Sequence, residues 1–338
     1  MRIAFLLISL MISGCVKEKS EKIDMNGFEK DPIPYCAGRL FLAVPSILVP
    51  ESLTIGSFKF SGLRAEDPSI DVFVEEIGMN ECQFNKKIQQ RSVELKSAGD
   101  ETTNILKHEK RLADDLYLFR VQEIDDAYIS EVLAVKGSNL VTVKMHSFRN
   151  QFDAAENQLI RLVKGVIVGG AAVKEGGQGF CLGSVVVTGD FQEESGRFLY
   201  RSPNGINVNL IVDTYSPDER ISLHGRVSGS ESLLARFSVK HKVLRERERI
   251  VAGMKAQEWL SWAEIGPSEG QGAYGFAVET MRMKPQKLSP SLYLSMDTSQ
   301  PLADGTPTTT SMSDGEVIGL WDSIVNSIRV AAHSTSEK

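Results

Sequence analysis

The sequence has 338 residues, of which 42% are hydrophobic and 24% are charged. These proportions are ordinary for a globular protein, and a chain of this length has room for about two domains with cores of their own. The formal net charge of -6 argues against an electrostatic nucleic-acid binder. The four cysteines include no Cys-x-x-Cys pair, so the sequence argues against a disulfide scaffold, zinc ribbons and thioredoxin-like redox sites.

Residues 1–14 have the features of a bacterial lipoprotein signal peptide. Arg2 supplies a positive charge, residues 3–12 are apolar, and Ile12-Ser13-Gly14-Cys15 has the small-residue spacing of a lipoprotein cleavage box. The apolar stretch is too short to cross a bilayer, which needs about 20 residues. An ordinary signal peptide with a chance cysteine is the alternative. We therefore predict cleavage after residue 14 and lipidation of Cys15, which anchors the chain to a membrane.

The residues after Cys15 indicate where the anchored protein lies. Val16 occupies the position at which aspartate is the usual inner-membrane retention signal in enteric bacteria. The sequence therefore predicts a periplasmic protein anchored to the outer membrane. Residues 15–34 are rich in charge and end in two prolines, a composition that predicts a flexible tether.

A glycine-rich segment divides the rest of the chain. Residues 169–179 contain five glycines between two apolar blocks, and we expect this segment to be a linker. One domain is then expected at residues 35–168 and the other at residues 180–332, followed by a polar tail at residues 333–338.

Strands are expected in the same order in both halves. Their apolar residues alternate with period two, which is typical of strands with one buried face. The expected strands of the first half are residues 39–44, 57–61, 70–77, 104–108, 116–124, 128–134 and 140–148. Those of the second half are residues 182–188, 197–200, 206–215, 249–265, 274–281 and 291–297.

Helices are expected at matching places between and after these strands. Each half has a polar, helix-like segment, at residues 81–95 and 230–247. Each half also ends in an amphipathic helix, and the second of these begins with a capping box, Ser313-x-x-Glu316. The sequence therefore predicts the α+β class, with two similar domains that each consist of an antiparallel sheet covered by helices.

The search for an enzyme site gives little. The sequence contains no Gly-x-Ser-x-Gly, His-Glu-x-x-His or phosphate-binding loop. Residues 270–275 match Gly-x-Gly-x-x-Gly but precede a predicted strand, whereas a dinucleotide site needs a helix there. The five histidines, at positions 108, 146, 224, 241 and 333, have no metal-ligand spacing. We therefore expect no catalytic residue, cofactor or metal, and no enzymatic activity.

Two further features are candidates for partner contacts. Residues 240–249 carry mixed charges, which favours the wet side of a helix, with a surface for an acidic partner as the alternative. Trp321 lies on the apolar stripe of the last predicted helix. Trp259 and Trp262 lie three residues apart in a predicted strand, so we expect them to face opposite ways and one of them to be exposed.

Three parts of the sequence carry motifs that occur together in one family. Residues 35–45 read Tyr-Cys-x-Gly-Arg-Leu-Phe-Leu-x-Val-Pro, and residues 179–182 read Gly-Phe-Cys-Leu. The C-terminal third agrees best, in residues 252–260, 274–276, 290–292, 296–298, 313–316 and 320–324. Together these segments resemble two-domain periplasmic immunity proteins of the Tle/Tli type, which act against phospholipase (lipase) effectors of type VI secretion.

The resemblance implies a protein without catalytic activity. Such proteins bind the cognate lipase effector in the periplasm and block access to its active site, with both domains contributing, and so protect the producing cell and its siblings. The implied partners are this effector and, through Cys15, a membrane. The resemblance identifies no effector-binding residues. The alternative is a structural or chaperone-like envelope lipoprotein that binds lipid or another envelope protein.

The three cysteines that remain after lipidation are an odd number for an oxidising compartment. Cys36 and Cys181 precede the first strand of each half, and both lie in segments that resemble the family. We therefore predict a Cys36–Cys181 disulfide, with Cys82 free and buried. A Cys36–Cys82 disulfide within the first domain is the alternative.

The predicted lipid anchor can be tested directly. Cys15→Ala should leave an unlipidated precursor, because the thiol that accepts the acyl chain is removed. Labelling of cells with radioactive palmitate measures this. Equal incorporation into the wild-type and variant chains would contradict the prediction.

Overall fold

The computed structural model describes residues 32–64, 66–76, 78–99, 102–149, 151–169, 179–215, 221–227, 240–265, 272–281, 284–299, 310 and 312–331. The predicted signal peptide, Cys15, most of the tether, linker residues 170–178 and the polar tail lie outside this part of the chain.

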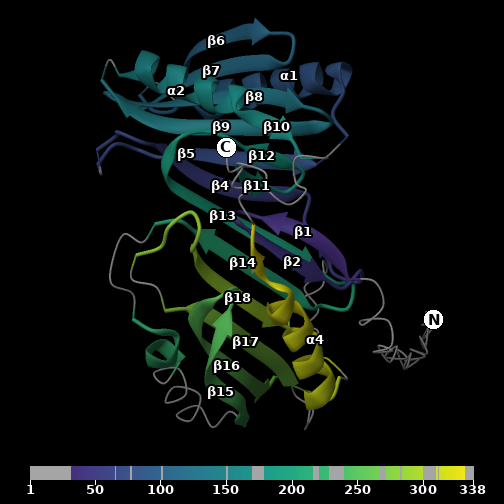
Figure 1. The fold of residues 1–338 in the computed structure, drawn as a ribbon. Helices are drawn as coiled ribbons and strands as arrows, with labels where there is room; N and C mark the ends of the chain where they lie inside the picture. The colour runs from purple at the N-terminus through teal and green to yellow at the C-terminus, as the bar shows by residue number, and fades with distance from the viewer. Residues whose placement is uncertain are drawn as a thin grey trace, which may run out of the picture.

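The two halves contain matching elements (Figure 1). The first half contains β1 (Ile33–Ala37), β2 (Leu40–Val44), β3 (Val49–Pro50), β4 (Leu53–Phe60), β5 (Ile70–Glu76), α1 (Glu81–Ala98), β6 (Ile105–Ala113), β7 (Leu116–Ile124), β8 (Ala127–Lys136), β9 (Asn139–Phe148), α2 (Phe152–Lys164) and β10 (Val166–Val168). The second half contains β11 (Phe180–Leu182), β12 (Val185–Val187), β13 (Phe191–Arg201), β14 (Asn207–Asp213), β15 (His241–Val251), β16 (Met254–Glu264), β17 (Gly272–Thr280), β18 (Ser291–Asp297), α4 (Asp314–Ser327) and β19 (Arg329–Val330).

One sheet runs through both halves of the molecule. The strand order is β4-β5-β9-β8-β7-β6 in the first half and β13-β14-β18-β17-β16-β15 in the second. The two orders correspond element by element, and β4 pairs with β13 in antiparallel fashion. The predicted α+β class with antiparallel strands is confirmed. The two predicted sheets are joined edge to edge into a single 13-stranded sheet.

The pairing of β4 with β13 requires glycine at its centre. Gly56 lies directly opposite Gly196. A Cβ atom on Gly56 would lie 2.8 Å from Leu182 Cδ1, and one on Gly196 would lie 2.7 Å from Phe180 Cε1. Both distances are shorter than carbon atoms tolerate, because carbon atoms in contact are about 3.5–4.0 Å apart. The two glycines therefore let strand β11 pack directly onto the junction of the halves.

Each half contributes a short hairpin that pairs with a strand of the other half. The β1–β2 hairpin pairs with β19, which follows the last helix, and the β11–β12 hairpin pairs with β10, which follows α2. Each hairpin thus packs against the final strand of the other half. Cys36 and Cys181 form a disulfide between β1 and β11, and Arg39 makes a buried ion pair with Glu194 of β13. The first hairpin is therefore tied to the second half by covalent and ionic contacts.

The two faces of the sheet differ in what covers them. One face, which we call the closed face, is covered by α2, α4 and the two small sheets (Figure 1). Its core is one continuous cluster that includes residues of both halves, such as Val72, Leu159, Phe180, Leu210 and Trp321. The opposite face, which we call the open face, carries α1 over a smaller cluster around Phe84 and Phe119. Because the main core spans both halves, neither half has a complete core alone.

The structure corrects three predicted elements. Residues 182–188 were expected to form one strand, but a turn at residues 183–184 separates β11 from β12. Residues 241–251 form strand β15 rather than the end of a helix, while residues 230–239 lie outside the described part of the chain. Residues 249–265 were expected to form one strand, but the chain reverses at Ala252 and Gly253, both of which have positive φ. The reversal places β15 beside β16 as a hairpin. The helices expected at residues 81–95 and at the end of each half, and the capping box at Ser313, are confirmed.

The predicted burial of Cys82 is wrong. The thiol is free, as expected, but exposed. Cys82 lies in the first turn of α1, and the residues of this helix that pack on the sheet are Phe84, Ile88 and Leu95. Because Cys82 lies outside that apolar stripe, its side chain faces solvent.

The arginines of β15 hold α4 against the edge of the sheet. Glu258 of β16 is fully buried and pairs with Arg245, Arg247 and Arg249, and it also accepts a hydrogen bond from Trp321 Nε1 at 2.9 Å. Burial alone would raise the pKa of Glu258, but the bonds from Trp321 and Arg249 outweigh burial and lower it. The basic stretch at residues 240–249 is therefore partly occupied by contacts within the molecule.

We expect Glu258→Gln to lower the free energy of unfolding by about 3 kcal/mol at neutral pH, because it removes the fully buried charge of a network in which Asp322 alone cannot balance the arginines of β15. The folded-state pKa of Glu258 lies below the ordinary value of 4.5. Its contribution is therefore present above pH 4.5 and is lost as the pH falls through the folded-state pKa. The difference between wild type and variant should shrink in acid.

Urea denaturation at neutral and acidic pH measures this effect. Glu66→Gln is the control, because the Glu66 side chain is 65% exposed in its pair with Arg64 and such pairs contribute little. A Glu258→Gln variant as stable as the control variant would contradict the assigned role.

We also expect the halves to stay together when the linker is cut. A protease site inserted within residues 170–178 should yield two fragments that co-elute in gel filtration, because the β4–β13 pairing and the shared core remain. Reduction of the disulfide should not separate them. Fragments that elute apart in native buffer would show that the halves are independent domains.

Candidate functional site

Part of the open face is not covered by any helix or strand of the described residues. Among the described residues, the only helical segments on this face are α1 at one end and residues 223–227 at the other. Between them lie β5, β4, β13, β14 and β18. Side chains on these strands alternate between the faces, so every second residue of each strand points away from the core.

A row of side chains crosses this uncovered surface at right angles to the strands. The printed sequence and the strand register place these residues directly opposite one another in adjacent strands, in the order Thr142, Phe73, Ile55, Arg197, Ile211 and Tyr293. We call them the cross-strand row. Ile55 and Arg197 are exposed, and the other members are half-buried. With strands about 4.8 Å apart, the row spans about 24 Å across the junction of the two halves.

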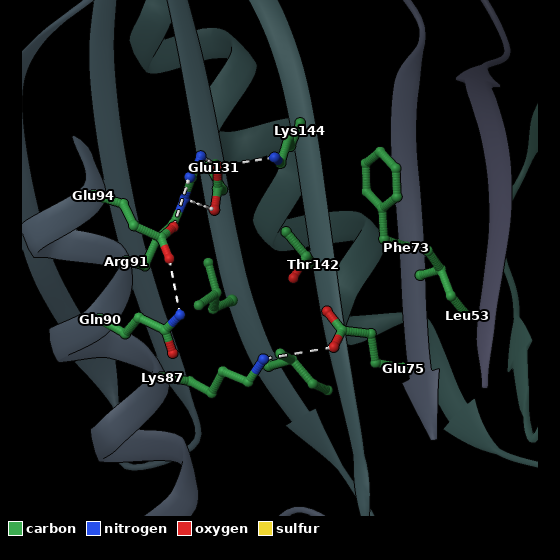
Figure 2. A pocket seen from close by; sticks show the side chains of 12 residues that line it. Leu53, Phe73, Glu75, Lys87, Gln90, Arg91, Glu94, Glu131, Thr142 and Lys144 are labelled. Atoms are coloured by element: carbon green, nitrogen blue, oxygen red, sulfur yellow. Dashed lines mark hydrogen bonds and ion pairs between the residues drawn. The ribbon is translucent and has the colours of Figure 1, made fainter. Parts of the chain in front are cut away.

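A hollow of about 260 Å³ lies at the α1 end of the row. Figure 2 shows Lys87, Arg91 and Glu94 reaching into it from α1, opposite Phe73 and Lys144 on the sheet. Its charged side chains are paired with one another rather than free. The hollow therefore offers an apolar strip beside paired charges.

The pair at the centre of this hollow fixes α1 to the sheet. Arg91 donates two hydrogen bonds to Glu131 of β8, from Nε at 2.9 Å and from Nη2 at 2.8 Å. Lys144 Nζ lies 3.2 Å from the same carboxylate. The hydrogen bonds to Glu131 raise the pKa of the Arg91 guanidinium, so the guanidinium stays protonated. Glu131 is 3% exposed.

The other end of the row repeats this arrangement. Arg226, in the helical segment at residues 223–227, pairs with Glu279 of β17, the strand that corresponds to β8 in the sheet order. Ile211 and Tyr293 line the hollow beside this pair. An adjoining hollow of about 300 Å³ is lined mainly by apolar groups, including Trp259 and Ala277. Two similar borders, each fixed by an arginine and a buried glutamate, thus enclose the row.

The tryptophans and the arginines of the basic stretch, which were candidates for partner contacts, are engaged in contacts within the molecule. Trp259 and Trp262 do face opposite ways, but neither is exposed: Trp259 is buried against His224, and Trp262 is half-buried beneath Lys242. The arginines of the basic stretch pair with Glu258 and Asp322. In the described part of the chain, no group of three or more metal-ligating side chains is placed to hold a metal ion.

The two sulfur atoms of Cys36 and Cys181 lie on the closed face, where the hairpins meet, and form the disulfide that the sequence predicted. They do not contribute to the cross-strand row. No helix in the described part of the chain is long and apolar enough to cross a membrane.

The residues of the cross-strand row were not predicted from the sequence, although two of them are apolar at strand positions where the alternation calls for a polar residue. In residues 70–76 the alternating core positions are Ile70, Val72 and Val74, yet Phe73 is also apolar. In residues 207–213 Ile211 stands out of phase with its apolar neighbours in the same way. Single apolar residues on a solvent-facing strand face are normal, whereas a contiguous group of them marks a contact surface, and such a group becomes visible only when the strands are placed in order.

The comparisons with known proteins agree with the segments noted in the sequence. Residues 176–332 match the family model described as the Tle cognate immunity protein 4 C-terminal domain. The resemblance to Tle/Tli-type immunity proteins is therefore confirmed. No curated protein matches the chain.

Solved structures of such immunity proteins have a similar fold. A chain in the crystal structure of the Tle4–Tli4 complex is 20% identical, with a TM-score of 0.68, and the match covers 92% of this chain and 100% of that one. The apo immunity protein TplEi of Pseudomonas aeruginosa type VI secretion is 19% identical, with a TM-score of 0.65 and coverage of 91% and 100%. TplEi complexed with "L" peptide is 20% identical, with a TM-score of 0.62 and coverage of 91% and 99%. The immunity-protein fold thus extends over both halves.

Proposed function

We propose that the chain is a periplasmic immunity protein that binds a Tle-type phospholipase effector and blocks access to its active site. The match of residues 176–332 to an immunity-protein family is the observation that carries this proposal. The similar fold of a chain in the Tle4–Tli4 complex supports it. The family match also favours a role without catalysis, since an immunity protein acts by binding.

The open face is the surface that we propose for effector binding. Stable interfaces of standard size bury about 1,600 Å² in total, and their central contacts are enriched in aromatic residues and arginine. The cross-strand row has this composition, with Phe73 and Tyr293 near its ends and Arg197 between two isoleucines. Its backbone is held by strand pairing on both sides, so binding requires little ordering of loops.

We also propose that the protein acts from the outer membrane through a lipid on Cys15. Such an anchor raises the local concentration of the inhibitor at the membrane whose phospholipids the effector attacks. This part of the proposal is supported by the sequence of residues 1–15.

The proposed inhibition should be stoichiometric. Titration of the cognate phospholipase with the mature chain should abolish lipid hydrolysis near an equimolar ratio, with no consumption of the inhibitor, because the complex forms by tight binding. Hydrolysis of a fluorogenic phospholipid measures this. The proposed immunity function would be contradicted if the chain inhibits no phospholipase that is encoded beside it.

Ile55→Asp should weaken the inhibition at least about 100-fold, because it places a charge in the centre of an interface that must exclude water. Ile167→Asp is the matched control: Ile167 is 43% exposed on β10, on the closed face, and Ile55 is 39% exposed. Isothermal titration calorimetry and circular dichroism measure affinity and folding. Equal weakening by both variants would contradict binding through the open face.

A further inference from the structure

Arg197 occupies an unusual position in the cross-strand row. It lies on β13 at the junction of the halves, directly between Ile55 of β4 and Ile211 of β14. Its side chain is exposed, and its one side-chain hydrogen bond among the described residues runs from Nε to Asn209 Oδ1 at 3.0 Å. Both Nη groups are thus without a hydrogen-bond partner in the described part of the chain.

The other cations on the central strands of the open face have carboxylate partners. Lys59 Nζ lies 3.8 Å from Glu193 Oε1, and Arg201 Nε lies 2.6 Å from Glu51 Oε1. The nearby carboxylate of Asp213 accepts a hydrogen bond from Ser195. At both ends of the row the arginines are likewise paired, as described above. Among the cations of the central strands in the described part of the chain, Arg197 is therefore the one without a carboxylate partner.

The surroundings of Arg197 would make a partner carboxylate bind strongly. Isoleucines on both sides offer apolar surface, so a partner that covers the row removes water from around the guanidinium. A guanidinium with free Nη groups matches the two oxygens of a carboxylate, and such charge-assisted bonds are short and strong. The hydrogen bond that Nε donates to Asn209 Oδ1 fixes the plane of the guanidinium before binding. An uncovered Arg197 stays hydrated, so the free protein is not destabilised.

We propose that Arg197 is the specificity-determining contact of the open face, and that it binds an aspartate or glutamate side chain of the effector. The carboxylate lies on an apolar ridge of the effector, whose neighbouring side chains cover Ile55 and Ile211. The inference rests on the proposed function, because it names the chemistry of the surface that the effector presents. It places the energetic centre of the interface at the junction of the two halves.

The experiment measures the affinity of the full mature chain for the cognate phospholipase by surface plasmon resonance. Arg197→Ala should raise Kd at least about 30-fold, mainly through faster dissociation, since removal of one partner of a covered charge pair acts on the dissociation rate. Arg197→Lys should lie between wild type and the alanine variant, because the charge remains but the paired geometry is lost. Arg197→Glu should bind most weakly.

A charge exchange identifies the partner group. Replacement of the contacting effector carboxylate by lysine should restore binding to Arg197→Glu while weakening binding to wild type. Lys164→Glu is the matched control for charge reversal, because Lys164 is exposed at the end of α2 on the closed face, and it should bind like wild type. Thermal denaturation should show the Arg197 variants to be folded, since the side chain makes no buried contact.

The outcomes separate the inference from the proposed function. If wild type inhibits the phospholipase but Arg197→Ala binds within threefold of it, the inference is wrong and the proposed function stands. If wild type binds no phospholipase, both are wrong. If every effector carboxylate can be replaced without loss of affinity, a carboxylate is not the partner.

Discussion

The contact between β4 and β13 determines the rest of the structure. Gly56 faces Gly196 at its centre, and the space that two Cβ atoms would occupy is filled by Phe180 and Leu182 of the second hairpin. This packing turns two edge strands into the middle of one sheet. It also places residues from both halves in one core, so the two halves that the sequence suggests are packed together rather than separated by a linker.

The different structures of the two sheet faces follow from that shared core. Helices α2 and α4 and the exchanged hairpins bury the closed face, which supplies most of the apolar burial. The centre of the open face has half-buried apolar side chains on strands that are paired on both sides. Two arginine–glutamate pairs, Arg91 with Glu131 and Arg226 with Glu279, hold the borders of that surface in place. Rigid borders favour tight binding because fewer groups must be ordered on association.

The two outermost strands of the long sheet have unpaired edges, which must be protected from pairing with other chains. β6 and β15 lie at its two ends, and unpaired edges invite pairing with other chains. Both strands carry many charged residues, which oppose such pairing. The charges of β15 also hold a helix in place. Its arginines pair with Glu258 of β16 and Asp322 of α4 and so attach α4 to this edge of the sheet. This explains why a sequence segment with mixed charges, which resembles the wet side of a helix, is a strand.

Local patterns in the sequence determined most of the elements and the two-fold repetition of their order, because periodicity and capping act within a few residues. The out-of-phase Phe73 and Ile211 are local signals of a second apolar surface, but they were recognised as such only once the strand pairing placed both of them in the cross-strand row. The joining of the sheets and the exchange of the hairpins were decided by the tertiary structure. These features depend on which distant surfaces fit together: Arg197 meets Ile55 and Ile211 only because β13 lies between β4 and β14, and no spacing along the chain specifies that contact.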